Sequence, residues 1–238
     1  LHAGHFINHL MEYEKWTAPG FDLTISHTRL MPNIRYQLND LTLNFGSSFS
    51  KLENINGEGE DKLVPDASTL SLGSYLIIDY LKNNLGFNAG LRYDYKKLSS
   101  DDEMLNNDYE NMFSYTSFST GAYYSVADHI LRATYSGAFR SPHLSELFSN
   151  GVHHGTNRYE IGNIDLDIEY ANQFDFKYQW SDEHLGLVIN PFIQYISNYI
   201  TINPTDSFIS GNTVYNYLQY DNVTLSGLEM NLHYHPHY

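Results

Sequence analysis

The chain has 238 residues, no cysteine, and 28 acidic against 13 basic side chains, which gives a formal charge of −15 at pH 7. This acidic balance argues against nucleic acid as a partner because phosphate binding needs a basic surface. The lack of cysteine excludes disulfides and thiolate metal sites. No apolar run reaches the roughly 18 residues of a membrane-spanning helix. A membrane β-barrel stays open, because each of its strands needs only one apolar face.

The first 20 residues allow two interpretations. In a helix, His5, His9 and Glu12 would share one face, and the spacing of the two histidines could hold a metal ion. In a strand, the two histidines share a face with Ile7 and Met11 instead. The pattern does not separate these alternatives.

The rest of the chain predicts a series of strands. Residues 21–38 suggest two strands around a turn at Pro32. From Leu41 to Tyr234, apolar and polar side chains alternate, as in strands with one apolar face. Tight connections lie near Asn83, Ala127 and Asp182, whereas long ones cover residues 53–66, 100–113, 140–164 and 204–211. This asymmetry is typical of an outer-membrane barrel. A soluble extracellular β-sandwich that binds carbohydrate or a protein partner would show the same alternation of side chains.

The connection Phe139–Glu169, here called the signature segment, is unusually elaborate. Ser141 can cap a helix and Pro142 can occupy its first position. Apolar residues follow at helical spacing, at Leu144, Leu147 and Phe148. We therefore expect one short helix within the 140–164 loop. Backbone geometry explains Gly151, Gly155, Gly162 and Asn163. A loop with this density of special residues usually carries function.

A spaced set of residues runs through the signature segment: Arg140, Pro142, Glu146, Leu147, Gly151, His153, His154, Gly155, Tyr159, Glu160, Gly162, Asn163, Leu166 and Glu169. This set resembles the signature in the barrel domain of TonB-dependent outer-membrane receptors. The version with paired histidines resembles receptors for metals and metal complexes.

The resemblance implies an all-β fold of antiparallel up-and-down strands from a large transmembrane β-barrel, of which this chain supplies about ten. Residues 1–238 would be part of one barrel domain, with the plug domain and the remaining strands absent. The implied location is the outer membrane of a Gram-negative bacterium. The implied function is energy-coupled uptake of a metal ion or metal complex, with zinc first, then iron-siderophore and haem. The implied partners are outer-membrane lipid, the plug domain of the same protein and a TonB-type inner-membrane complex that acts through the plug.

Five residues of the signature segment could ligate a metal. Imidazole and carboxylate groups of the kind that zinc or iron accepts occur at His143, His153, His154, Glu146 and Asp165. Adjacent His153 and His154 point opposite ways in an extended chain, so at most one of them faces a given site. The alternative is that these histidines are exposed to water or pack against a neighbouring loop.

Three charged residues suggest a structural latch. Arg140 can hold Glu146 and Glu160 through its guanidinium fork and so fasten the helix against the returning strand. No catalytic motif occurs in the sequence, neither GxSxG, P-loop, HExxH nor EF-hand. We therefore expect neither an enzyme nor a resident cofactor, and a metal ion or metal complex would be cargo.

Overall fold

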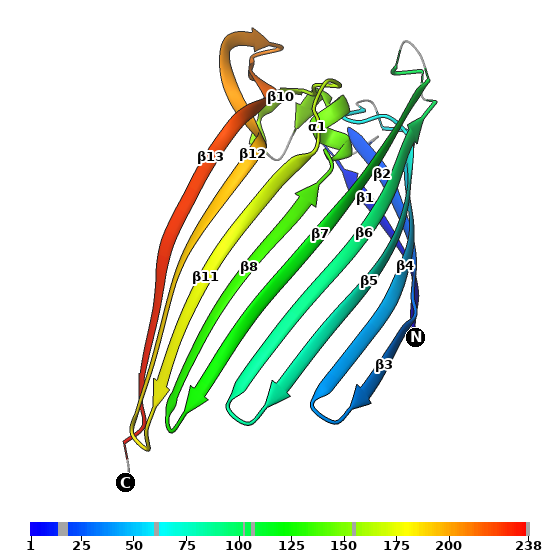
Figure 1. The fold of residues 1–238 in the computed structure, drawn as a ribbon. Coiled ribbons are helices and arrows are strands. Elements are labelled where there is room, and N and C mark those ends of the chain that lie inside the picture. The colour runs from blue at the N-terminus through cyan, green and yellow to red at the C-terminus, as the bar shows by residue number, and fades with distance from the viewer. Residues whose placement is uncertain (14–18, 60–61, 102, 106–107, 154–155, 237–238) are drawn as a thin grey trace.

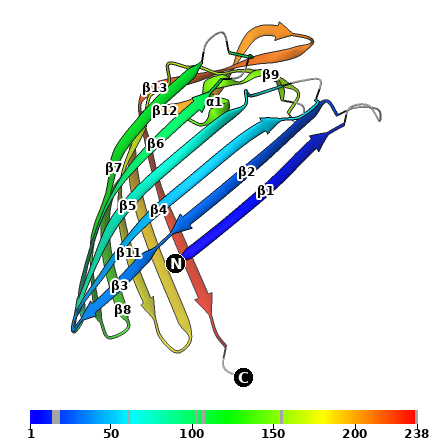
Figure 2. The same ribbon diagram turned by 90° about the vertical axis from the view of Figure 1, so that its right-hand side faces the viewer.

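The strands of the chain form one curved sheet. A computed structural model describes residues 1–13, 19–59, 62–101, 103–105, 108–153 and 156–236. The sheet has 13 strands in the order β1-β2-β4-β5-β6-β7-β8-β11-β12-β13-β10-β9, and β3 pairs with β4. The long strands slant the same way around a trough, as in part of a barrel wall (Figures 1 and 2). The predicted all-β fold with one short helix is confirmed, with more strands than expected.

The strands are β1 (His2–Glu12), β2 (Phe21–Met31), β3 (Asn33–Leu38), β4 (Leu41–Asn56), β5 (Ala67–Lys82), β6 (Leu85–Ser100), β7 (Tyr109–Val126), β8 (His129–Arg140), β9 (Asn150–His153), β10 (Arg158–Ile161), β11 (Glu169–Ser181), β12 (Leu185–Ile209) and β13 (Asn212–Tyr234), and the helix is α1 (Leu144–Phe148). Neighbouring long strands are antiparallel, whereas β10 runs parallel to β13.

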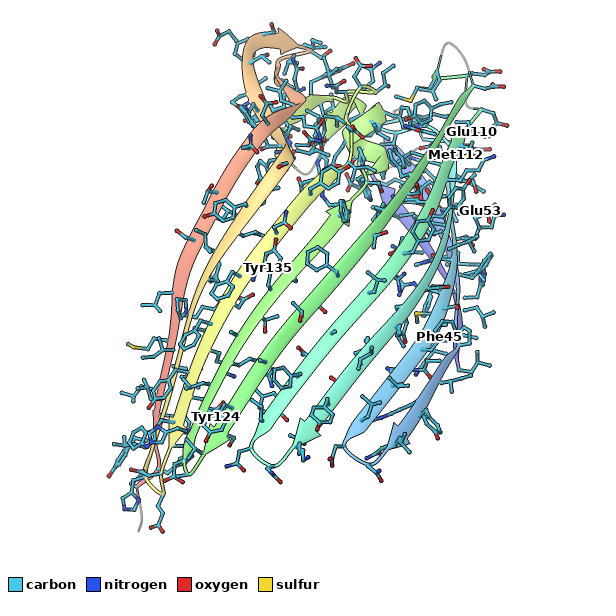
Figure 3. All side chains as sticks on the ribbon, in the orientation of Figure 1. Phe45, Glu53, Glu110, Met112, Tyr124 and Tyr135 are labelled. Carbon is cyan, nitrogen blue, oxygen red and sulfur yellow. The ribbon has the colours of Figure 1, made fainter. Side chains whose placement is uncertain are left out.

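The pairing register separates the side chains into two faces. Leu91 on β6 lies opposite Phe118 on β7, and both are exposed. Their neighbours Arg92 and Asp94 point to the other face, where they form an ion pair. We call the apolar side the outer face and the polar side the lumenal face. Phe45 stands away from the trough on the outer face (Figure 3).

The exposed outer face rules out the soluble β-sandwich. A sandwich needs a second sheet to bury its apolar stripe, but these strands form one sheet. Leu91 is 59% exposed and Phe45 is 53% exposed. The total accessible surface of 15084 Å² is well above the roughly 11,000 Å² of a soluble monomer of this mass. An apolar face of this size marks a contact with lipid or with a partner.

Residues 21–38 do not form two strands around a turn. β2 and β3 both pair with β4 in one register, because Leu30 lies opposite Phe49 and Asn33 lies opposite Gly46. The chain therefore runs straight through Pro32, which interrupts the strand because it has no N–H to donate. The carbonyl of Pro32 still accepts a hydrogen bond from the Ser47 amide at 3.0 Å.

The prediction of a loop at residues 204–211 is also wrong. β12 continues to Ile209, and only Ser210 and Gly211 turn the chain into β13, both with positive φ. The register shifts between Pro204 and Phe208, so the proline causes an irregularity within the hairpin rather than a loop.

Of the two interpretations of the N-terminal residues, helix or strand, the strand is correct, because His2–Glu12 form β1. His9 Nε2 lies 2.6 Å from Asp22 Oδ1.

The buried core lies at the loop end of the trough. Leu147 and Phe148 of α1 pack with Leu98 of β6 and Ile200 of β12. Leu98 shares the lumenal face of β6 with Arg92 and Asp94, so the helix covers that face. α1 has five residues. Within the described ranges, no helix is both long and apolar enough to cross a membrane.

Candidate functional site

The helix of the signature segment begins two residues later than expected. His143, not Ser141, is the N-cap, and a capping box joins it to Glu146. The Glu146 carboxylate accepts a hydrogen bond from the His143 amide at 2.6 Å. Ser141 instead meets Lys96 of β6, with 2.7 Å between Oγ and Nζ. A histidine is an uncommon cap, so residue preference favoured the serine.

The cap depends on a neutral imidazole. His143 Nδ1 accepts from the Ser145 amide at 3.5 Å and lies 3.1 Å from the Ser145 hydroxyl. Burial lowers the pKa of His143; the nearby Glu146 carboxylate opposes this, and the charges of Lys96 and Arg140 add to it. Because only the neutral ring can accept at Nδ1, protonation removes the acceptor.

We expect the stability of α1 to fall in acid. Because the folded-state pKa is lowered, the contribution of the cap is complete above the unfolded-state pKa of about 6.5 and is lost as the pH falls through the folded-state pKa. The loss should be about 1 kcal/mol, as for other helix caps. Protease cleavage within the signature segment of the intact receptor, measured between pH 7.5 and pH 5, checks this. His143→Asn keeps an acceptor that does not titrate, and an unchanged pH dependence in that variant would contradict the role of His143.

Arg140 connects three elements at the top of β8. Its guanidinium donates to both oxygens of Glu146 at 2.9 and 2.8 Å and to Glu169 of β11 at 3.4 and 3.1 Å. Glu169 also accepts from the amide of Ile200 on β12 at 3.0 Å. Of the predicted latch residues, the structure brings Arg140 and Glu146 together, and it adds Glu169. The latching role itself stays a prediction.

Glu160 lies elsewhere, in a buried cluster under the helix. Its side chain is 2% exposed and accepts from Arg158 Nε at 2.6 Å and from the Tyr217 hydroxyl at 3.0 Å. Arg158 also lies over the ring of Tyr215, 5.4 Å from its centroid. Because β10 pairs with β13 along only four residues, these side chains add to a short ladder. The cluster holds β10 to the wall.

The other end of the β9–β10 hairpin reaches the loop between β4 and β5. The Asn150 amide donates to the Leu63 carbonyl at 3.0 Å. The Gly162 amide donates to the Ser149 carbonyl at 2.7 Å, and a Cβ on Gly162 would lie 2.5 Å from the Leu147 carbonyl carbon. The signature segment therefore extends from β13 to residue 63 across the loop end of the trough (Figure 1).

Among the described residues, the predicted metal ligands do not form one site. His143 caps α1 and Glu146 holds Arg140, whereas Asp165 is exposed. His153 lines a cavity of about 140 Å³ beside Leu23 and Leu63, and its buried Nδ1 has no hydrogen-bond partner among the described residues. His154 lies outside the described residues. Within the described part of the chain, no group of three or more histidine and acidic side chains could hold a metal ion. Metal ligation by the signature segment stays a prediction.

Sequence reasoning missed Arg158, Tyr217 and Glu169 as members of these clusters. Arg158 and Glu160 are two residues apart and share a strand face, so alternation could have paired them. Tyr217 is 57 residues from Glu160 in sequence. Only the register of β10 against β13 brings it close.

Comparison with known proteins defines the class. Residues 6–237 match the family described as TonB dependent receptor-like, beta-barrel. The chain therefore belongs to the TonB-dependent receptor β-barrel family, whose members are outer-membrane transport receptors rather than enzymes. No curated protein sequence matches the chain.

Solved structures with the same fold are distant in sequence. The haemophore receptor HasR of Serratia marcescens, in complex with HasA and haem, is 17% identical, with a TM-score of 0.68 over 92% of this chain and 41% of that one. The copper transporter OprC is 15% identical, with a TM-score of 0.75 over 92% and 37%. The iron transporter FrpB of Neisseria meningitidis is 16% identical, with a TM-score of 0.67 over 92% and 34%. The chain thus spans less than half the length of these receptors.

Proposed function

We propose that the chain is part of the barrel wall of an outer-membrane receptor that takes up a metal ion or metal complex by energy-coupled transport. The family match over residues 6–237 is the observation that carries this proposal. In the proposed receptor, the outer face contacts lipid, and the lumenal face surrounds a plug domain through which a TonB-type complex of the inner membrane acts. Haem or a metal would be cargo rather than a cofactor.

The strand edges support the proposal that residues 1–238 form part of one barrel domain. In the described residues, β1 pairs only with β2, and β13 pairs with β10 only along Thr213–Asn216 on its second edge. Unpaired backbone groups are very costly in lipid. Further strands of the same receptor would pair with these edges and close the barrel.

Two observations support the substrate class. The structural relatives are a haemophore receptor in complex with haem, a copper transporter and an iron transporter. In the part of the chain that the structure describes, the buried Nδ1 of His153 at the loop end has no hydrogen-bond partner, and His154 is next to it in sequence. Imidazole nitrogen suits zinc, copper and iron. We keep zinc as the first candidate, followed by iron-siderophore and haem.

Uptake by cells tests this function. Bacteria with and without the intact receptor are given radiolabelled zinc, a labelled ferric siderophore or labelled haem at limiting concentration. We expect receptor-dependent accumulation of one of the three, abolished when the inner-membrane proton gradient is collapsed. Equal accumulation of all three in both strains would refute metal uptake as the function.

A further inference from the structure

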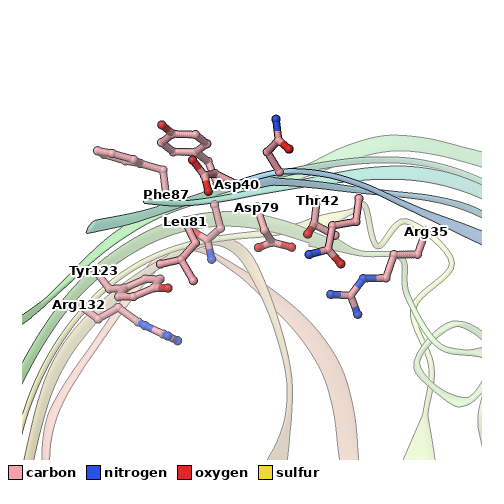
Figure 4. Close-up of a pocket in the computed structure, with 12 residues that line it drawn as sticks. Arg35, Asp40, Thr42, Asp79, Leu81, Phe87, Tyr123 and Arg132 are labelled. Carbon is pink, nitrogen blue, oxygen red and sulfur yellow. The ribbon is translucent and has the colours of Figure 1, made fainter. Parts of the chain in front are cut away.

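A polar pocket lies on the lumenal face at the opposite end from the signature segment. It has a volume of about 590 Å³ and lies beside the short turns that join β3 to β4 and β5 to β6. The side chains of Arg35, Thr42, Asp79, Tyr123 and Arg132 all lie on the same side of the sheet (Figure 4). A ligand that crosses the barrel from the loop end would meet this pocket last.

The guanidinium of Arg132 is held in place by a stack of side chains. Tyr123 of β7 lies directly opposite Gly86 of β6, and a Cβ on Gly86 would lie 2.0 Å from the ring. The ring therefore lies flat across the glycine. Arg132 of β8 is opposite Tyr123 on the other side, with its Cζ 5.4 Å from the ring centroid. This cation–π contact orients the guanidinium without using its N–H donors.

A second cation faces Arg132 across the next strand pair. Lys177 of β11 lies directly opposite Arg132 in the register, on the same lumenal face. Like charges directly opposite one another in a sheet are destabilising. Within the described residues, Arg132, Lys177 and Arg35 form no ion pair. Asp40 and Asp79 line the pocket as well and balance the charges of Arg35 and Arg132, so Lys177, beside Arg132, adds one positive charge. An anion bound between Arg132 and Lys177 would offset the repulsion of these two cations.

We propose that Arg132 and Lys177, apposed at the edge of the pocket, bind a carboxylate. Arg132 supplies a fork of parallel donors that suits a carboxylate, and Lys177 adds a point charge beside it. This inference rests on the proposed function, because it places the site on the path through a receptor barrel. The carboxylate belongs either to a metal complex in transit or to an acidic side chain of the plug domain.

Thermal unfolding of the intact receptor in detergent tests the site. The probe is tricarballylate, a tricarboxylate, added to wild type, to Arg132→Gln/Lys177→Gln and to the control Lys51→Gln/Lys97→Gln. The control removes the same charge from the outer face, where each lysine has its own carboxylate, Glu53 and Glu110, at 2.7 Å. For a diffusible ligand we expect tricarballylate to raise the midpoint of wild type and control by about 3 °C and to leave the lumenal variant unchanged.

Two other outcomes are decisive as well. If the plug supplies the carboxylate, the lumenal variant unfolds at a lower temperature than the control, and tricarballylate has no effect on wild type. If the lumenal variant is as stable as wild type or more stable and tricarballylate has no effect, or if all three proteins respond equally, the site is refuted. Because this measurement does not depend on transport, a failed uptake assay with an intact tricarballylate response would refute metal uptake alone.

Discussion

Replacing Arg158 with methionine is expected to destabilise the attachment of β10 by about 3 kcal/mol. The variant leaves the Glu160 carboxylate, 2% exposed, with the Tyr217 hydroxyl as its one side-chain partner among the described residues. A buried charge without its counter-ion is much more costly than a buried ion pair or a neutral replacement. The loss is measured by unfolding the intact receptor with guanidinium chloride in detergent. Protease cleavage of the signature segment reports how far this segment has unfolded.

The matched control is the double variant Arg158→Met/Glu160→Gln. It removes both charges and keeps an amide that can bond Tyr217, so we expect it to recover more than half of the stability lost in the single variant. A double variant less stable than the single one would contradict the assignment of the cost to an unpaired buried carboxylate.

Replacing Gly162 with alanine is expected to cost about 2–3 kcal/mol. The added methyl would lie 2.5 Å from the carbonyl carbon of Leu147 and 2.6 Å from the amide nitrogen of Phe148. These are backbone atoms of the helix, so no side-chain rotation relieves the contact. Either α1 leaves its core or the chain after β10 moves away from it, and both changes expose Leu147. The same unfolding and cleavage measurement applies.

Gly90→Ala provides a control on the lumenal face. Its Cβ would meet only the Ser119 hydroxyl within 3 Å, at 2.9 Å. A hydroxyl can rotate away, so we expect a loss under about 0.5 kcal/mol, as for ordinary surface changes. Equal losses in the two alanine variants would show that the contact with α1 does not explain the glycine at 162.

The sequence predicted the strands of the barrel wall better than the positions where those strands are interrupted. Alternation along β6 and β7 placed Leu91 and Phe118 on one face, since a strand shows its period directly. Prolines misled the reasoning at Pro32 and Pro204, because a proline breaks a ladder in much the same sequence context as it makes a turn. Only pairing with a neighbouring strand distinguishes the two, and pairing is not local.

In the signature segment, local contacts were predictable and distant ones were not. Arg140 and Glu146 are six residues apart and meet as the helix forms. Glu160 belongs with Arg158 and Tyr217 because β10 joins β13 in parallel, a connection that no local pattern indicates. The pairs of glycine and aromatic ring across strands, such as Gly86 with Tyr123, likewise follow from register alone.

The two-faced wall is the central claim, and single-cysteine labelling tests it most directly, because the chain has no cysteine of its own. Cysteines at Leu91 and Phe118 of the outer face, and at Gly90 and Ser119 of the lumenal face, carry a fluorophore in the intact receptor in bilayers of brominated lipid. We predict strong quenching at the first two positions and weak quenching at the other two. Equal quenching at all four, or the reverse order, would contradict a barrel wall with lipid on its apolar side.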